Sequence, residues 1–220
     1  STLPHKWDPQ PMSSARSGGR SADLAARREG FRKRTEQYLL RGHDRLAAAW
    51  FVAAFAGSLD GPVLDVGTGK GLLATALAGR GVRVVSIDPD DGDQALACLL
   101  AGEAGVGDRI DFVRGDAARL PFAAGRFGGA AMMAVLHHLH EPASVLRDMS
   151  RVVRTGGVLV VADFSEEGFE LVSRVHREEG GDHPRCGITV DEAVAELERQ
   201  GLRCIGRREG HSYLVAAFEK

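Results

Sequence analysis

The sequence has few cysteines, few aromatic residues and no excess of charge of one sign. The three cysteines among 220 residues, Cys98, Cys186 and Cys204, stand far apart and form no C-x-x-C pair. This spacing argues against a disulfide framework and a zinc ribbon, and it favours a reducing, cytoplasmic compartment. Aromatic residues make up 6% of the chain and the formal net charge is −2. Neither value indicates a surface built for nucleic acid, so a nucleic-acid partner is not expected.

Long apolar runs are also missing, and the first residues are polar rather than signal-like. We therefore expect no membrane partner. With 44% hydrophobic residues, a chain of this length can bury one sizeable core. The composition predicts a flexible tail over residues 1–22, a helical N-terminal cap over 23–57 and a single domain over 58–220.

From residue 58 onward, short apolar runs alternate with helical patterns. Strands are predicted over 63–66, 83–88, 110–116, 128–135 and 156–164, with helices between them. A last helix is predicted over 190–200, followed by two strands at 202–208 and 212–219. This order predicts an α/β fold: a doubly wound, mostly parallel sheet of seven strands, with a C-terminal hairpin that places an antiparallel strand at its end.

A glycine-rich turn, Gly67-Thr68-Gly69-Lys70-Gly71, follows the first predicted strand. Glycines let the backbone turn sharply and approach a ligand, and the helix that follows offers free N–H groups. Two phosphate-binding motifs do not fit the spacing. A dinucleotide fingerprint would need glycine in place of Leu72, and a P-loop would need glycine in place of Leu64 and Ser or Thr in place of Gly71.

Carboxylates stand at the ends of three predicted strands: Asp65, Asp88 and Asp116. Asp65, beside the turn, suits a cationic or ammonium-bearing ligand better than a pyrophosphate, which it would repel. Asp88 is placed for hydrogen bonds to ribose hydroxyls, and Asp116 can accept a hydrogen bond from an exocyclic amine. The three together are more specific than any one of them.

These segments resemble the class I S-adenosylmethionine-dependent methyltransferases. VLDVGTGKG is similar to the first signature of that family, VVSIDPD to the acidic end of its second strand and GDAARLPF to its third-strand turn. Residues 127–164 resemble the ubiquinone-biosynthesis-like, or methyltransferase type 11, subgroup. The resemblance covers about residues 60–165 and implies a Rossmann-like methyltransferase fold with S-adenosyl-L-methionine as cofactor.

The resemblance also implies which residues hold the methyl donor. Asp65 and the turn at 67–71 would border the methionine portion, Asp88 the ribose, and Asp116 with Ala117 the adenine. Backbone after the fourth strand would close over the donor. The expected donor-binding residues are Asp65, Gly67, Thr68, Gly69, Gly71, Asp88, Pro89, Asp116, Ala117, Met133 and Ala134.

Methyl transfer from a sulfonium is an in-line displacement in which alignment supplies most of the rate. A base is needed only if the acceptor atom carries a proton. The candidates are His137, His138 and His140, which we expect chiefly to line the donor pocket, with His138 slightly preferred over His137 as a general base. Because neighbouring side chains on a strand point to opposite faces, no metal site is predicted.

Residues 165–188 follow the fifth strand, where members of this family build their acceptor pocket. We hypothesise that His176 and His183 contact the acceptor; the alternative is that they are solvated loop residues. The spacing H-x₆-H-x₂-C, which ends at Cys186, matches no metal site. The basic N-terminal helices are interpreted as a lid with Tyr38 facing inward, rather than as an RNA-binding face.

The sequence therefore predicts an enzyme that transfers a methyl group from S-adenosylmethionine to a small-molecule acceptor. The alternatives are an RNA or protein methyltransferase and a non-catalytic donor-binding partner subunit. Against methylation of nucleobases, no D/N-P-P-Y motif follows the fourth predicted strand and no cysteine stands there to attack a pyrimidine.

Overall fold

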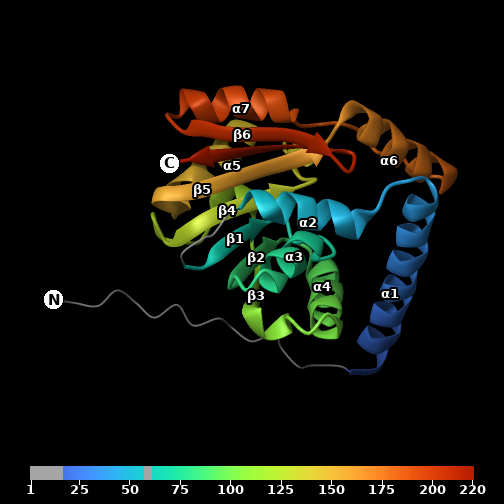
Figure 1. Ribbon diagram of the computed structural model, residues 1–220. Helices are drawn as coiled ribbons and strands as arrows, with labels where there is room; N and C mark the ends of the chain where they lie inside the picture. Colours follow the sequence, from blue (N-terminus) through green and yellow to red (C-terminus); the bar gives the residue numbers. More distant parts are fainter. Residues whose placement is uncertain (1–16, 57–60) are drawn as a thin grey trace.

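A mixed sheet of seven strands forms the centre of the computed structural model, which describes residues 17–56 and 61–220 (Figure 1). The strands are β1 (Val63–Val66), β2 (Val84–Asp88), β3 (Ile110–Arg114), β4 (Phe127–Met133), β5 (Val153–Phe164), β6 (Arg203–Gly210) and β7 (Tyr213–Glu219). Their order in the sheet is β3-β2-β1-β4-β5-β7-β6, and β7 alone runs in the direction opposite to the other six strands. The predicted fold class is confirmed.

One detail of the predicted sheet is wrong. The antiparallel strand β7 does not end the sheet, because it inserts between β5 and β6 and leaves β6 at the edge. Ladder pairing explains the order, since β7 pairs with β5 along its whole length, from Tyr213 opposite Phe164 to Glu219 opposite Val158.

Helices cover both faces of the sheet (Figure 1). They are α1 (Ser17–Leu40), α2 (Arg45–Phe55), α3 (Leu72–Gly79), α4 (Asp91–Glu103), α5 (Pro142–Val152), α6 (Glu166–Glu178) and α7 (Val190–Arg199), with three short 3₁₀ turns, η1 (Gly107–Arg109), η2 (Ala117–Arg119) and η3 (Leu136–His138). α2 and α3 contribute to the apolar cluster on one face, and α5 and α7 to the cluster on the other. Among the described residues, no helix has both the length and the apolar character needed to cross a bilayer.

Local sequence explains where these helices form. α5 has a proline in its first turn and turns Val145, Leu146 and Met149 toward the sheet at helical spacing. α7 begins with a capping box, in which the Thr189 side chain accepts from the backbone of Glu192 and the Glu192 side chain accepts from the backbone of Thr189. α6 is not predicted from the sequence, although Val172 and Val175 form its buried stripe.

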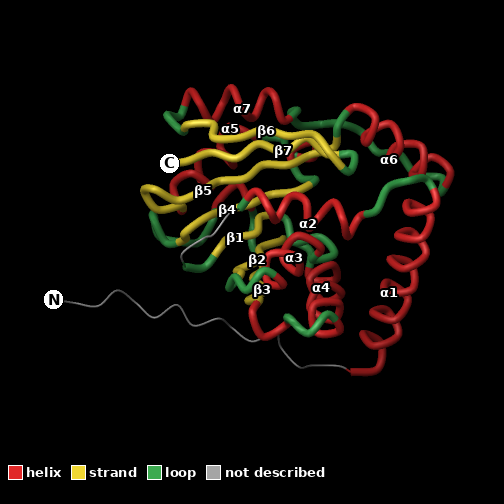
Figure 2. Tube along the Cα trace, in the orientation of Figure 1, coloured by secondary structure: helices red, strands yellow, loops and turns green. Residues whose placement is uncertain are grey.

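α1 stands beside the body of the domain, along α4 and with its C-terminal end next to α6 (Figure 2). It begins at Ser17, inside the segment predicted as a tail; residues 1–16 of that segment lie outside the described residues. Ion pairs hold α1 in place: Arg28 to Glu103 of α4 at 2.9 Å, and Arg34 to Glu179 after α6 at 2.6 Å.

The approach of α6 to the terminal hairpin requires a glycine at position 168. A Cβ there would lie 2.2 Å from the backbone oxygen of Ser212. We expect Gly168→Ala to lower the free energy of unfolding by about 1–3 kcal/mol, because the hairpin would have to shift. Gly30 in α1 has no atom within 4 Å of such a Cβ. Gly30→Ala should instead raise stability by about 0.5–1 kcal/mol. Urea titrations measure both, and equal effects of the two substitutions would contradict the close contact.

Candidate active site

A cavity of about 520 Å³ opens at the carboxyl ends of the central strands. Ligands of doubly wound sheets bind at this edge. Predicted donor residues that line the cavity are Gly67, Thr68, Gly69, Asp88, Pro89, Asp116, Ala117, Met133 and Ala134. On the acceptor side, the cavity is lined by Tyr38, His137, His138, His176 and His183. Of the residues predicted to bind the donor or the acceptor, all line this cavity except Asp65 and Gly71. A larger hollow of about 790 Å³ lies at the opposite edge, at the amino ends of the strands, and contains none of these residues.

The glycine turn needs its glycines for two physical reasons. Gly67, Gly69 and Gly71 all have positive φ, at 83°, 48° and 76°. This left-handed region is costly for other residues. In addition, a Cβ at Gly67 would lie 2.4 Å from a methyl group of Val135, and one at Gly71 would lie 2.7 Å from the Cβ of Ala97. The turn therefore packs directly against the segment after β4 and against α4.

Asp65 lies beneath the turn rather than in the cavity. Its side chain is buried, and one carboxylate oxygen accepts a hydrogen bond of 2.6 Å from the Ser86 hydroxyl. The Ser86 hydroxyl lies 2.6 Å from that of Thr68. Burial raises the pKa of Asp65 to about 7. The carboxyl group thus holds the turn through a chain of side chains, whereas the sequence analysis predicts contact with the ligand.

Asp88 fixes the other side of the turn. One of its carboxylate oxygens accepts from the backbone N–H of Gly69 at 2.9 Å, and the other accepts from the backbone N–H of Asp90 at 2.9 Å. A carboxylate oxygen has two lone pairs, so each can accept a further bond from a ligand hydroxyl. At the end of β3, Asp116 accepts from the backbone N–H of Ala118 and caps η2.

The residues after β4 form a turn, not a continued strand. Ala134 has φ of 57°, and Leu136–His138 form the 3₁₀ turn η3. The expectation that His137 and His138 point to opposite faces of a strand is therefore wrong. Their ring centroids lie 3.9 Å apart.

His137 is fixed by an aspartate from β5. The ring nitrogen Nδ1 lies 2.7 Å from Oδ1 of Asp163, and the backbone N–H of His137 donates to Oδ2 at 3.0 Å. Both side chains are buried. Because a carboxylate only accepts hydrogen bonds, Nδ1 carries a proton, and in the neutral imidazole Nε2 then presents a lone pair.

The loop after α6 brings His183 to the same place. The backbone N–H groups of Cys186 and Gly187 both donate to the backbone oxygen of His137 at 2.9 Å. A Cβ at Gly187 would lie 1.9 Å from the backbone oxygen of Leu136, so only glycine allows this approach. The ring centroid of His183 lies 4.9 Å from that of His137 and 4.6 Å from that of His176.

We call His137, His138, His176 and His183 the histidine cluster. Burial lowers the pKa of His183 to about 4, and neighbouring imidazoles add to the effect. Burial also lowers the pKa values of His138 and His176. These three rings are therefore neutral near pH 7.

His43 and Arg45 are among the cavity residues that are not predicted from the sequence. His43 is buried, and its ring stacks on Tyr213 at 5.9 Å and meets Tyr38 edge-on at 5.5 Å. Burial lowers the pKa of His43 to about 4. The guanidinium of Arg45 lies 5.3 Å from the ring centroid of Tyr38. Both residues follow Gly42, where the sequence predicts a break between two helices. This break is the sequence feature that could have indicated that they line the cavity.

Comparison with known proteins gives consistent matches. A family profile described as "Methyltransferase domain" matches residues 64–161. A demethylmenaquinone methyltransferase of Mycolicibacterium paratuberculosis is 33% identical over 173 residues, which cover 76% of this chain and 70% of that protein. One from Renibacterium salmoninarum is 38% identical over 116 residues, which cover 53% of this chain. The chain spans only 46%, 56% and 60% of the length of the first curated relatives.

Among solved structures, a SAM dependent methyltransferase from Aquifex aeolicus shares the fold. Its TM-score is 0.63 at 20% identity, and the match covers 87% of this chain and 97% of that one.

The buried carboxyl of Asp65 makes stability depend on pH. Its pKa is about 7 in the folded protein and about 4 in an unfolded chain, so the folded state holds an extra proton between these values. Stability from this group is present at low pH and is lost as the pH rises toward 7. Asp65→Asn removes this dependence. Urea unfolding measures the free energy of unfolding of both proteins between pH 4 and pH 8. As the pH rises, the wild type should lose stability relative to the variant.

Asp111→Asn, at an exposed position, serves as the control and should leave the pH dependence of the wild type unchanged. If the free energies of unfolding of the wild type and of D65N differ by the same amount at pH 5 and at pH 8, Asp65 is not the group involved.

Proposed function

The chain belongs to the class I S-adenosylmethionine-dependent methyltransferases, and from this premise we propose that it methylates a small aromatic acceptor held against the histidine cluster. A single observation supports the proposal most strongly. One cavity joins the strand-end residues that suit a nucleoside to a second region lined by aromatic rings and imidazoles. Donor and acceptor would therefore meet inside the same enclosure, where alignment can supply the rate.

The donor would lie along the ends of β1, β2 and β3. The glycine turn would face its methionine portion, Asp88 and Pro89 its ribose, and Asp116 with Ala117 its adenine. Met133 and Ala134 would then border the sulfonium end, next to the histidine cluster. A sulfonium is a cation, so imidazoles with lowered pKa values are suitable neighbours because they add no positive charge.

The acceptor side of the cavity favours a flat ring with a hydroxyl group. Phe164 and Tyr213, whose ring centroids are 4.7 Å apart, form an aromatic wall, and Val172 and Tyr38 add apolar surface. Arg45 offers a positive charge for an oxygen that ionises. Relatives are named "Demethylmenaquinone methyltransferase" and "Ubiquinone biosynthesis O-methyltransferase", and these names support a hydroquinone-type acceptor.

A hydroxyl nucleophile must lose its proton, and the histidine cluster is placed to promote that loss. His137 is the better candidate for a base than His138, because Asp163 fixes its tautomer and leaves Nε2 with a free lone pair. His138 has no such partner within the described hydrogen bonds. His176 and His183 would complete the wall against which the acceptor packs.

The basic residues of α1 favour a lid over an RNA-binding face. Most of them pair with carboxylates: Arg27 with Asp23, Arg28 with Glu103, Arg32 and Lys33 with Glu29, and Arg34 with Glu179. Arg41, directly after the helix, pairs with Glu178. Paired cations present little net charge to a phosphate backbone. The pairs to α4 and α6 instead place α1 where Tyr38 closes one side of the cavity.

Donor binding is tested at Asp88. We expect Asp88→Asn to weaken the binding of S-adenosylmethionine by roughly tenfold to a hundredfold, since hydrogen bonds to a charged carboxylate are lost. Asp91→Asn, an exposed neighbour at the start of α4, is the matched control and should bind like the wild type. Titration calorimetry gives both affinities. A wild type that binds no donor would end the proposal.

Acceptor activation is tested at His137. With a water-soluble naphthohydroquinone as acceptor, His137→Gln should reduce kcat by about a hundredfold or more, because deprotonation is impaired. The affinity for the donor should not change. His140→Ala, at an exposed histidine outside the cavity, is the control. Formation of S-adenosylhomocysteine measures turnover, and an unchanged kcat in His137→Gln would remove the cluster from the mechanism.

A further inference from the structure

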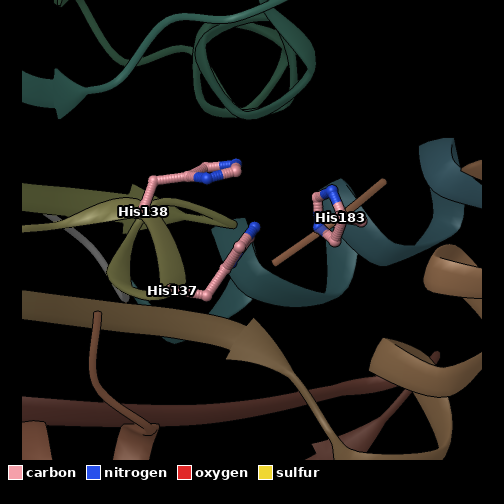
Figure 3. Close-up of side chains that lie close together, drawn as sticks. All are labelled: His137, His138 and His183. Atoms are coloured by element: carbon pink, nitrogen blue, oxygen red, sulfur yellow. The ribbon is translucent and has the colours of Figure 1, made fainter. Parts of the chain in front are cut away.

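Three imidazoles of the histidine cluster converge on one point of the cavity wall (Figure 3). His137 and His138 come from η3, and His183 comes from the loop after α6. One ring nitrogen from each lies within 4.8 Å of the other two. Zinc–nitrogen bonds of 2.0–2.1 Å in a tetrahedral site place two ligand nitrogens about 3.4 Å apart. Small side-chain rotations would therefore bring the three nitrogens to ligand spacing.

Two of these rings have a buried nitrogen that lacks a partner. Nε2 of His137 and Nε2 of His183 are shielded from solvent, and neither forms a hydrogen bond with the described residues. His137 itself is 2% exposed. Buried polar atoms are normally satisfied, so a pair of unsatisfied nitrogens facing the same space indicates a missing ligand. A cation that accepts lone pairs would satisfy both.

The surroundings of His137 are those of a metal ligand. Asp163 binds Nδ1 at 2.7 Å and so directs Nε2 toward the other two rings. Histidines that bind metals usually donate their second nitrogen to a carboxylate in this way, which fixes the ring and raises its basicity. Asp163 also accepts from the backbone N–H groups of His137 and Phe164, and is therefore itself held in place.

The third ligand is positioned by backbone contacts as well. The hydrogen bonds from Cys186 and Gly187 to the oxygen of His137 tie the loop to η3, so that His183 and His137 approach through one rigid junction.

We propose that His137, His138 and His183 bind a zinc ion whose fourth position faces the cavity. Three histidines with one open position are the ligand pattern of catalytic zinc rather than of structural zinc. The role of the open position rests on the proposed function: an acceptor hydroxyl would bind there and release its proton to water more readily. His137 then acts through the metal, because its one free lone pair is occupied.

The test is metal binding by the full chain, independent of turnover. Protein stripped with a chelator and dialysed is titrated with Zn²⁺ in a calorimeter, and with Co²⁺ by visible absorption. We expect one ion per chain. His138→Ala and His183→Ala should each weaken zinc binding by about a hundredfold or more, and Asp163→Asn by about tenfold to a hundredfold. His140→Ala, the neighbouring exposed histidine, should bind zinc as the wild type does.

The proposal is overturned if the wild type binds zinc no better than the triple variant H137A/H138A/H183A, or if His140→Ala loses affinity equally. His138 is the most accessible of the three ligands, so His138→Ala should fold even if a variant of a buried ligand does not. Circular dichroism checks the fold of each variant. If the wild type binds S-adenosylmethionine but does not bind zinc, this inference alone is overturned. If it binds zinc but not S-adenosylmethionine, only the proposed function is overturned.

Discussion

The architecture of the site depends on the turn after β1 being held from below and from the side. Asp65, with its carboxyl buried, supports it through Ser86 and Thr68, and Asp88 binds the N–H of Gly69. Within this turn, Gly67 packs directly against Val135, the residue just before η3. Because one contact links the two segments, the geometry of the donor end and that of the histidine cluster are set together.

The parts of the fold that follow from short stretches of sequence are predictable. Apolar runs between helical patterns mark the parallel strands, and parallel strands must present their carboxyl ends at one edge, which places Asp88 and Asp116 correctly. The position of β7 between β5 and β6 depends on pairing between distant segments, so it is not visible in either strand alone. The same holds for His183, which reaches His137 only through a folded loop.

Asp65 and η3 show two limits of reasoning by spacing. Asp65 is not the last residue of β1, since Val66 continues the strand, and the alternation of side chains turns Asp65 toward Ser86 rather than toward the edge. At the end of β4, three residues in a 3₁₀ turn look the same in sequence as three more strand residues. The change removes the geometric argument against a metal site, because His137 and His138 then lie on the same side instead of facing apart.

Charge balance connects the donor with the histidine cluster. A sulfonium is a cation and repels nearby positive charges that have no negative partner. Desolvation lowers the pKa values of His43, His138 and His183, so these imidazoles are neutral and add no such charge. A zinc ion in the cluster would add positive charge next to the donor, offset in part by Asp163. The remaining charge, with that of Arg45, would be neutralised best by an acceptor oxygen that has lost its proton. Metal, donor and ionised acceptor would then stabilise one another, and a neutral acceptor without an ionisable oxygen would be disfavoured.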